Sequence, residues 1–249
     1  MIRMYAAVLA LLTATLAASA APLRVSVASF NIRYGTADDG PDHWQRRRDL
    51  VIDTVGRLEA DLVGLQEALY FQINEIRSKH PRYAAIGVGR NDGAFRGEYC
   101  AILYRHDRFT VAAAGTFWLS DTPETVASAT WGNRIPRICT WARLVDRMTG
   151  RGLYVYNAHL DHQSQPSREQ SVRLIAERIA ARAYDEPFVL MGDFNSEETN
   201  RAMAFLLRDA DGPGLVDSYR AVHPEGPAGT FNGFRGDTEG DKIDYILVP

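Results

Sequence analysis

Apolar and polar positions follow two different periods along this chain, and together they predict a mixed α/β protein. Residues 23–31 (LRVSVASFN) alternate and are rich in β-branched side chains, which is typical of a strand. Residues 44–58 and 168–183 carry apolar side chains three or four positions apart, the spacing of one helix face. Short apolar runs at residues 62–66 and 188–191 have the length of buried strands.

The middle of the chain is predicted to be mostly strand. Its β-prone runs, separated by Gly, Asp and Pro, are residues 84–88, 99–105, 109–119, 138–145 and 153–159. Two further helices and a last strand are expected at residues 71–79, 203–207 and 243–248. Because no linker or low-complexity segment divides the chain, we expect one α/β domain over residues 21–249.

One arrangement occurs twice in the sequence. In each copy a strand leads to an Asn, a loop and a helix follow, and a second short strand ends in an acidic residue. Asn31 and Glu67 are 36 positions apart, and so are Asn157 and Asp193. Coincidence is the alternative, since strand–helix–strand units of about this size are common. We favour a duplicated unit, which would bring both acids to the same end of two sheets packed face to face.

Residues 1–20 differ from the rest of the chain. Arg3 is their only charge, residues 6–17 form an apolar run, and Ala-Ser-Ala at residues 18–20 precedes Pro22. This order is typical of a secretory signal peptide, and a buried N-terminal helix is the alternative. No later stretch reaches the ~20 apolar residues of a membrane span. We therefore expect an exported protein, periplasmic or secreted, that does not insert stably into a membrane and acts as a monomer.

Charge and cysteine content narrow the function classes. The 249 residues include 28 Lys and Arg and 31 Asp and Glu, a formal net charge of −3. Residues 1–20 hold one basic residue and no acid, so the remainder has a net charge of −4. This charge argues against broad, tight binding to nucleic acid, which depends on neutralising phosphates. For Cys100 and Cys139, a cross-strand disulfide and two buried free thiols are both compatible with an exported chain.

Side chains suited to catalysis follow directly after several predicted strands. Asp193 and Asn195 follow a buried apolar run, and as positions i and i+2 they can converge on one ligand. Asn157 and His159 share a strand face in the same way. Glu67 also follows a buried strand, where a carboxylate is costly unless it is paired or bound to a cation. Carboxylates and amides with few soft ligands favour Mg²⁺ or Mn²⁺ over zinc.

In their order along the chain, these motifs resemble those of the endonuclease/exonuclease/phosphatase superfamily, which is DNase I-like. The motifs are Asn31, Gln66-Glu67, Asn157-x-His159, Gly192-Asp193-Phe194-Asn195 and Ile243-Asp244-Tyr245. The resemblance covers nearly all of residues 21–249. It implies an α/β four-layer sandwich, in which two mixed β-sheets pack face to face with helices outside. It also implies Mg²⁺-dependent (or Mn²⁺-dependent) hydrolysis of a phosphate ester.

The resemblance implies a role for each motif residue. Glu67 would be the principal metal ligand, with Asn31 beside it. His159 would contact or protonate a phosphoryl oxygen, Asp193 would orient or deprotonate the attacking water, and Asn195 would hold the phosphate.

Five further residues receive roles by the same resemblance or by their position. Asp244 would complete the catalytic site, and Glu98 would hydrogen-bond the histidine. Arg137, Asn157 and Asn232 are candidate substrate contacts. A surface ion pair is the alternative for Glu98 and Arg137.

The sequence departs from the family pattern after Asp244. The Ser-Asp-His motif of the family, whose His is central to hydrolysis, has no counterpart here. The chain is then a fragment of an active enzyme, a naturally shortened and impaired protein, or a binding protein that keeps only the fold. We favour the first interpretation because every other motif is intact.

The predicted function is therefore metal-dependent hydrolysis of a phosphate ester. A nuclease and a hydrolase of small phosphoesters or phosphoinositides are the main choices of substrate, and the acidic charge mildly favours the second. The alternative is a catalytically impaired protein that binds a phosphate ligand. The aromatic-rich residues 230–234 (TFNGF) are expected to rim the site, because they lie shortly before Asp244.

Overall fold

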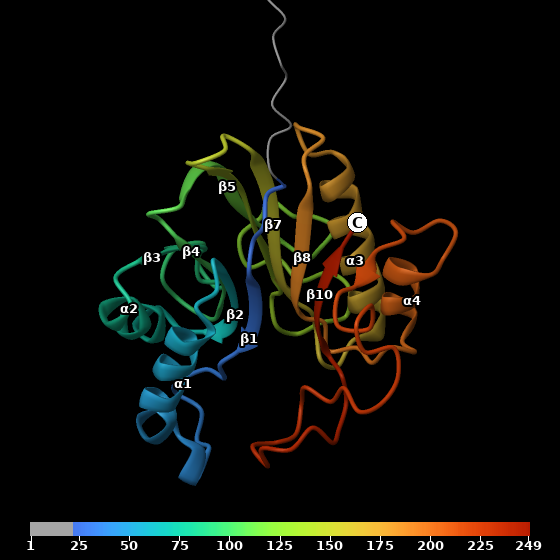
Figure 1. Cartoon of the computed structure of the whole chain (residues 1–249). Helices are drawn as coiled ribbons and strands as arrows, with labels where there is room; N and C mark the ends of the chain where they lie inside the picture. Colours follow the sequence, from blue (N-terminus) through green and yellow to red (C-terminus); the bar gives the residue numbers. More distant parts are fainter. Residues whose placement is uncertain (1–21) are drawn as a thin grey trace, which may run out of the picture.

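Two β-sheets form the centre of the protein, as seen in a computed structural model that describes residues 22–249 (Figure 1). The predicted signal peptide, residues 1–20, lies outside the described residues. The first sheet has the strand order β1-β2-β4-β3, formed by β1 (Val27–Asn31), β2 (Leu62–Ala68), β4 (Tyr99–Arg105) and β3 (Tyr83–Ile86). Within residues 22–249, no helix has the length and apolar character needed to cross a membrane.

The second sheet is larger and has the order β5-β6-β7-β8-β10-β9. Its strands are β5 (Phe109–Trp118), β6 (Ile138–Asp146), β7 (Gly152–His159), β8 (Phe188–Asp193), β10 (Asp244–Val248) and β9 (Val216–Asp217). Both sheets are mixed, because β1 pairs with β2 in parallel and β7 pairs with β8 in parallel, whereas their other pairings are antiparallel.

Helices cover the outer face of each sheet. Figure 1 shows α1 (Trp44–Leu58) and α2 (Tyr70–Lys79) on the side of the four-stranded sheet, and α3 (Gln165–Ala180) and α4 (Arg201–Leu207) on the other side. A short 3₁₀ helix, η1 (Gly40–Asp42), precedes α1. The α1 range is the predicted one, while η1 and β9 are too short to give a periodic signal in the sequence.

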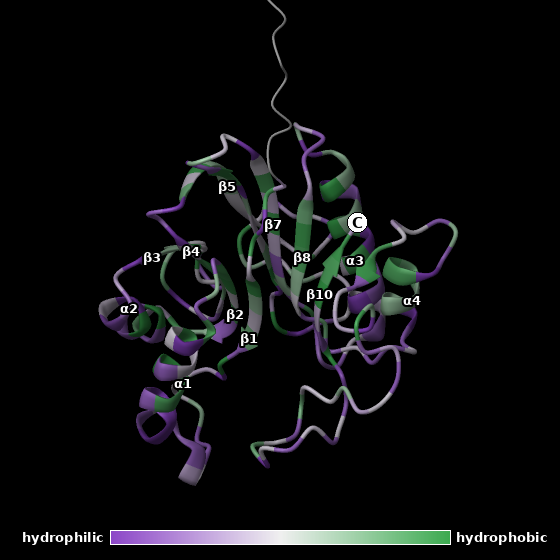
Figure 2. Cartoon of the chain, viewed as in Figure 1, coloured by the Kyte–Doolittle hydropathy of each residue, from purple (hydrophilic) through white to green (hydrophobic). Residues whose placement is uncertain are grey.

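Three layers of apolar side chains hold the sandwich together. One cluster lies between the sheets and includes Leu62 and Ile102 from the first and Val155 and Met191 from the second. Two others pack α1 and α2, and α3 and α4, against the outer faces. In Figure 2 the central strands consist largely of hydrophobic residues, whereas α1 and the surrounding loops carry many hydrophilic residues. These layers confirm the predicted four-layer α/β sandwich.

The two cysteines lie in this interior as free thiols. Cys100 on β4 and Cys139 on β6 are both buried and unpaired. Of the two alternatives that the sequence left open, the structure therefore has buried free thiols.

Candidate functional site

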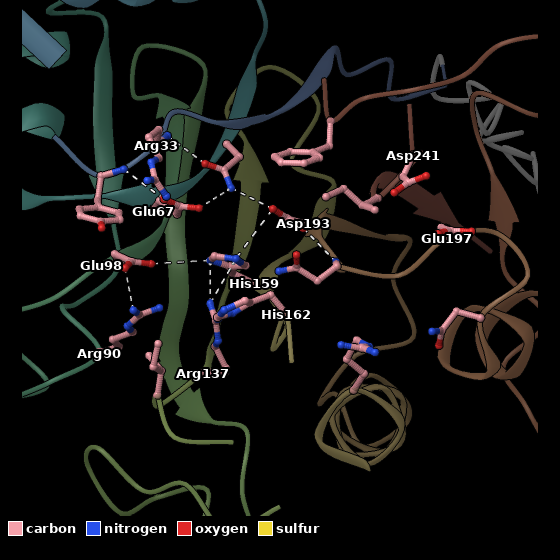
Figure 3. A pocket seen from close by; sticks show the side chains of 18 of the residues that line it. Arg33, Glu67, Arg90, Glu98, Arg137, His159, His162, Asp193, Glu197 and Asp241 are labelled. Atoms are coloured by element: carbon pink, nitrogen blue, oxygen red, sulfur yellow. Dashed lines mark hydrogen bonds and ion pairs between the residues drawn. The ribbon is translucent and has the colours of Figure 1, made fainter. Parts of the chain in front are cut away.

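A cleft of about 780 Å³ opens where the carboxyl ends of β2, β7 and β8 come together. Seven of the ten predicted site residues line it: Asn31, Glu67, Glu98, Arg137, His159, Asp193 and Asn195. They come from both sheets and from the loops between strands (Figure 3). The expectation that the two repeated units bring their acids to one end of the sandwich is confirmed.

A β-bulge directs Glu67 into this cleft. The pairing of β2 with β4 shifts register between Leu65 and Ala68, and Glu67 has a left-handed backbone with φ of 59°. A bulge inserts an extra residue and re-aims its side chain. Arg33 (φ 54°) and Asn195 (φ 46°) are also left-handed and also line the cleft. Conformations that are costly for non-glycine residues therefore gather here, which is characteristic of functional sites.

The Asn31 amide joins the acids of the two sheets. Its Nδ2 donates to Glu67 Oε1 at 3.1 Å and to Asp193 Oδ2 at 2.8 Å. The backbone N–H of Arg33 donates to Asn31 Oδ1 at 2.9 Å, which fixes the orientation of the amide. The second oxygen of Asp193, Oδ1, accepts from the Asn195 backbone N–H at 2.9 Å. Both carboxylate oxygens of Asp193 are thus held in place.

Negative charge is concentrated at this end of β8. Asp244 on β10 is the direct register partner of Asp193. Burial, and next the Asp244 carboxylate, raise the pKa of Asp193. Burial also raises the pKa of Asp244, and a hydrogen bond with Thr230 only partly opposes it. Among residues 22–249, Asp244 Oδ1 is buried without a hydrogen-bond partner. Two carboxylates buried this close together are costly to ionise.

His159 lies between two carboxylates and beside a guanidinium group. Its Nδ1 is 3.8 Å from Glu98 Oε2, and its Nε2 is 3.8 Å from Asp193 Oδ2. Arg137 Nη1 lies 3.3 Å and 3.2 Å from the two ring nitrogens. Burial, and then the charges of Arg137 and Arg90, hold the pKa of His159 well below its usual range. The surroundings of the imidazole therefore favour its neutral form.

Two nearly buried arginines lie on the same wall of the cleft. Arg137 is 3 % exposed, and its Nε donates to Asp161 Oδ2 at 3.3 Å while its Nη2 contacts His162 Nδ1 at 2.8 Å. Arg90 forms a 2.6 Å ion pair with Glu98. Burial raises the pKa of Glu98, and the charge of Arg90 opposes that rise. Fixed guanidinium groups in a cleft are suited to binding phosphate oxygens.

Three predicted site residues do not line the cleft, and their placement corrects the sequence interpretation. Asn157 is fully buried between the sheets, and its amide bonds to backbone and to Gln66, so it has no polar atom left for a substrate. Asn232 points into its own loop and donates to the Asp237 carbonyl. Asp244 is the register partner of Asp193 on the neighbouring strand and does not itself line the cleft. Of residues 230–234, Phe231 does line the cleft, as expected for that loop.

Several further residues that line the cleft are not predicted by any pattern in the sequence. They are Arg33, Tyr34, Arg90, Ile135, His162, Arg168, Glu197, Thr199, Asn200, Asp241 and Ile243. His162 is one of them, and its side chain is exposed in the cleft. Most of these residues lie in loops without periodicity, so no local pattern distinguishes them from ordinary surface residues.

A family model and several solved structures match this chain. The sequence model of a protein family, described as "Endonuclease/Exonuclease/phosphatase family", matches residues 28–249 of this chain. The crystal structure of an endonuclease/exonuclease/phosphatase from Bacteroides vulgatus superposes on this chain with a TM-score of 0.81 and 34% sequence identity. The match covers 90% of this chain and 86% of the Bacteroides vulgatus chain. The structure of a mannosyl-6-phosphatase from Bacteroides thetaiotaomicron matches with a TM-score of 0.80 and 33% sequence identity, and the match covers 90% of this chain and 85% of the phosphatase chain.

A viral relative is similar over a shorter region. An uncharacterised protein of Acanthamoeba polyphaga mimivirus is 28% identical over 163 residues, which is 62% of this chain and 60% of that protein. The chain therefore spans less than two thirds of this curated relative.

Proposed function

Because this chain belongs to the endonuclease/exonuclease/phosphatase family, whose members are hydrolases acting on phosphate esters, we propose that it hydrolyses a phosphate ester in the cleft described above. One observation carries the proposal. An amide and two carboxylates lie opposite a buried histidine–arginine pair in a single cleft, and both sheets contribute to the set.

The proposed reaction needs an oriented water, compensation of phosphoryl charge and a proton for the leaving oxygen. Asp193, held through both oxygens, would orient the water and accept its proton. Arg137 would bind phosphoryl oxygens, and neutral His159 would donate to one of them. The water oxygen bonds to phosphorus, the ester P–O bond breaks, and the leaving oxygen takes a proton from solvent, to which Asp193 returns the proton it accepted. The products are an alcohol and a phosphate with one ester bond fewer.

The donor set around Glu67 fits a hard divalent ion. Within residues 22–249, no three His, Cys, Asp or Glu side chains come close enough to form a metal site alone. Mg²⁺ does not require such a set, since it commonly takes one or two carboxylates and keeps water and substrate oxygens as its other ligands. We propose that Glu67 holds Mg²⁺ or Mn²⁺, and that Asn31, whose Nδ2 donates to Glu67 Oε1, positions this carboxylate beside the ion. When bound, the ion would supply positive charge to the phosphoryl group.

Hydrolysis of p-nitrophenyl phosphate and bis(p-nitrophenyl) phosphate, with and without Mg²⁺ or Mn²⁺, tests the proposal. We expect metal-dependent turnover that falls about 100-fold or more in Glu67→Gln, as for loss of a group that stabilises the transition state. Glu225→Gln is the matched control, because Glu225 is exposed and lies outside the cleft. Full activity of Glu67→Gln would overturn its assigned role. No turnover of any ester, with phosphate binding retained, would favour the alternative of a phosphate-binding protein.

We also propose that the protein acts outside the cytoplasm as a monomer. The pattern of residues 1–20 supports export. Cell fractionation with N-terminal sequencing should find a product that begins at Ala21, and light scattering should give the mass of one chain. An intact N-terminus in the cytoplasmic fraction would contradict export.

A further inference from the structure

The cleft has two ends of different chemistry. The first end holds three groups of the proposed reaction, Glu67, Asp193 and His159, and Glu98 beside His159. The second end, here called the outer arm, is lined by His162, Arg168, Glu197, Thr199, Asn200, Phe231 and Asp241. Figure 3 shows Glu67 and Glu98 at one side of the cleft and Glu197 and Asp241 at the other, with Asp193 and His159 between them. Because the reacting groups fill the first end, the rest of a bound substrate must lie along the outer arm.

Two carboxylates of the outer arm are free to bind a ligand. Glu197 and Asp241 are exposed, and in the described part of the chain neither side chain makes a hydrogen bond or an ion pair. The acids at the first end differ, since Glu67, Glu98 and Asp193 all have hydrogen-bonding partners. An ionised carboxylate only accepts hydrogen bonds, so these two select for groups that donate.

An aromatic ring lies beside one of these carboxylates. Phe231 and Asp241 form an isolated antiparallel bridge, in which the Phe231 N–H donates to the Asp241 carbonyl at 3.1 Å. Residues directly opposite each other in such a bridge project their side chains to the same face. The Phe231 ring is 61 % exposed. A bare ring face and an unpaired carboxylate are thus presented together on one wall.

Hydrogen-bond donors complete the outer arm. The Arg168 guanidinium is fixed by Gln165 Oε1 and by the Asp161 carbonyl, the latter at 2.8 Å from Nη1. His162 is exposed and uses Nδ1 for its contact with Arg137. The arm therefore offers acceptors, donors and one apolar face, and no lysine lines the cleft.

We propose that the outer arm binds the leaving group of the substrate, and that this group is a sugar or a similar neutral polyol, so that the substrate is a sugar phosphate. This inference rests on the proposed function. Sugar hydroxyls would donate charge-assisted hydrogen bonds to Glu197 and Asp241, while the apolar C–H face of the sugar would be buried on Phe231. A cleft of about 780 Å³ is the size of a small-molecule site.

The same arm disfavours nucleic acids and polyphosphorylated ligands. A second phosphate would lie against two unpaired carboxylates, and like charges at short range repel. Nucleic-acid binding depends on cations that neutralise successive phosphates, whereas on the outer arm the single guanidinium of Arg168 lies with two carboxylates, Glu197 and Asp241.

The test compares substrate selectivity in the full chain and its variants. The substrates are mannose 6-phosphate, glucose 6-phosphate, a nucleoside 5′-monophosphate, a short oligonucleotide and p-nitrophenyl phosphate. We expect wild-type kcat/KM to be at least 10-fold higher for one of the sugar phosphates than for the nucleotide and the oligonucleotide. In Asp241→Asn and Phe231→Ala, the ratio of kcat/KM for that sugar phosphate to that for p-nitrophenyl phosphate should fall about 10-fold. Asp211→Asn, an exposed acid outside the cleft, should leave the ratio unchanged.

The possible outcomes separate this inference from the proposed function. Equal or better hydrolysis of the nucleotide or oligonucleotide, or an unchanged ratio in both variants, overturns the sugar assignment while leaving phosphoester hydrolysis intact. If the wild type cleaves no ester at all, the proposed hydrolysis fails, and calorimetry with mannose 6-phosphate and glucose 6-phosphate then decides the sugar site. Binding that Asp241→Asn weakens about 10-fold supports the site, and absence of binding overturns it.

Discussion

Replacing Asn157 with alanine should destabilise the whole sandwich, because this side chain joins the two sheets from the inside. Asn157 lies on β7 and is 0 % exposed. Its Nδ2 donates to the backbone carbonyls of Leu65 at 3.0 Å and Ala101 at 2.8 Å, which belong to the other sheet. Its Oδ1 accepts from Gln66 Nε2 at 2.7 Å. The substitution removes all three bonds at once.

The expected loss follows from these contacts. Each buried hydrogen bond contributes about 1 kcal/mol net, and a buried partner left unsatisfied costs about 1–3 kcal/mol. Gln66 Nε2 keeps weaker contacts with Ser29 Oγ and the Gly64 carbonyl, which limits the penalty on that side. We therefore expect Asn157→Ala to lower the free energy of unfolding by roughly 3–5 kcal/mol. This is a large share of the ~5–15 kcal/mol that stabilises a typical domain.

Urea unfolding followed by circular dichroism measures this loss, provided that the m-value is unchanged. The control is Asn232→Ala, since Asn232 was also predicted to bind substrate but makes a single bond within a loop. It should change stability by less than about 0.5 kcal/mol. An Asn157→Ala protein with near-normal stability and a raised KM would refute the structural role and restore the substrate contact suggested by the sequence.

Three further predictions concern backbone geometry, acid stability and metal. Gly192→Ala should cost more than about 3 kcal/mol, because φ is +148° and a Cβ would collide with the Ala158 carbonyl oxygen; an unchanged Tm would contradict this close approach. Asp61→Asn should cost about 1–3 kcal/mol at neutral pH. Burial alone would raise the pKa of Asp61, but hydrogen bonds from Ser26 and Arg108 outweigh it and lower that pKa. The ionised Asp61 carboxylate therefore contributes its full stabilisation of the folded protein above its unfolded pKa of about 4, and this contribution is lost as the pH falls through the folded pKa. The free energies of unfolding of wild type and variant, measured by urea titration, should therefore converge in acid. Removal of divalent ions with EDTA should abolish hydrolysis and excess Mg²⁺ or Mn²⁺ should restore it; turnover that persists in EDTA would exclude the proposed metal dependence.

Most of the fold could be predicted from local patterns and from the family resemblance. The spacing of apolar residues predicted the bounds of α1, and a β-prone run between turn-forming residues predicted those of β4. The helix of the second repeated unit, α3, begins at Gln165 rather than at residue 168. Ser164 caps this helix, because its Oγ accepts a hydrogen bond from the Ser167 N–H. Such capping depends on the side-chain conformation of one residue and has no periodic signal.

Some residues of the candidate site were predicted correctly from the sequence and others were not. Asn157 and His159 were expected to share a face of one strand, and all eight residues of β7 are buried, so alternation could not show which of them reaches the cleft. His159 reaches it because it ends the strand, while Asn157, two residues earlier, lies between the sheets.

The sequence by itself determined which chemical groups this protein carries and where each lies within its own strand or helix. Those properties depend on neighbours only a few positions away. The tertiary structure alone decided which groups meet, because Asn31 and Asp193 are 162 positions apart and come together only when the two sheets pack. It also decided the character of the outer arm, since Phe231 and Asp241 lie in a loop region and are brought together by a single bridge. No local period encodes contacts of this kind.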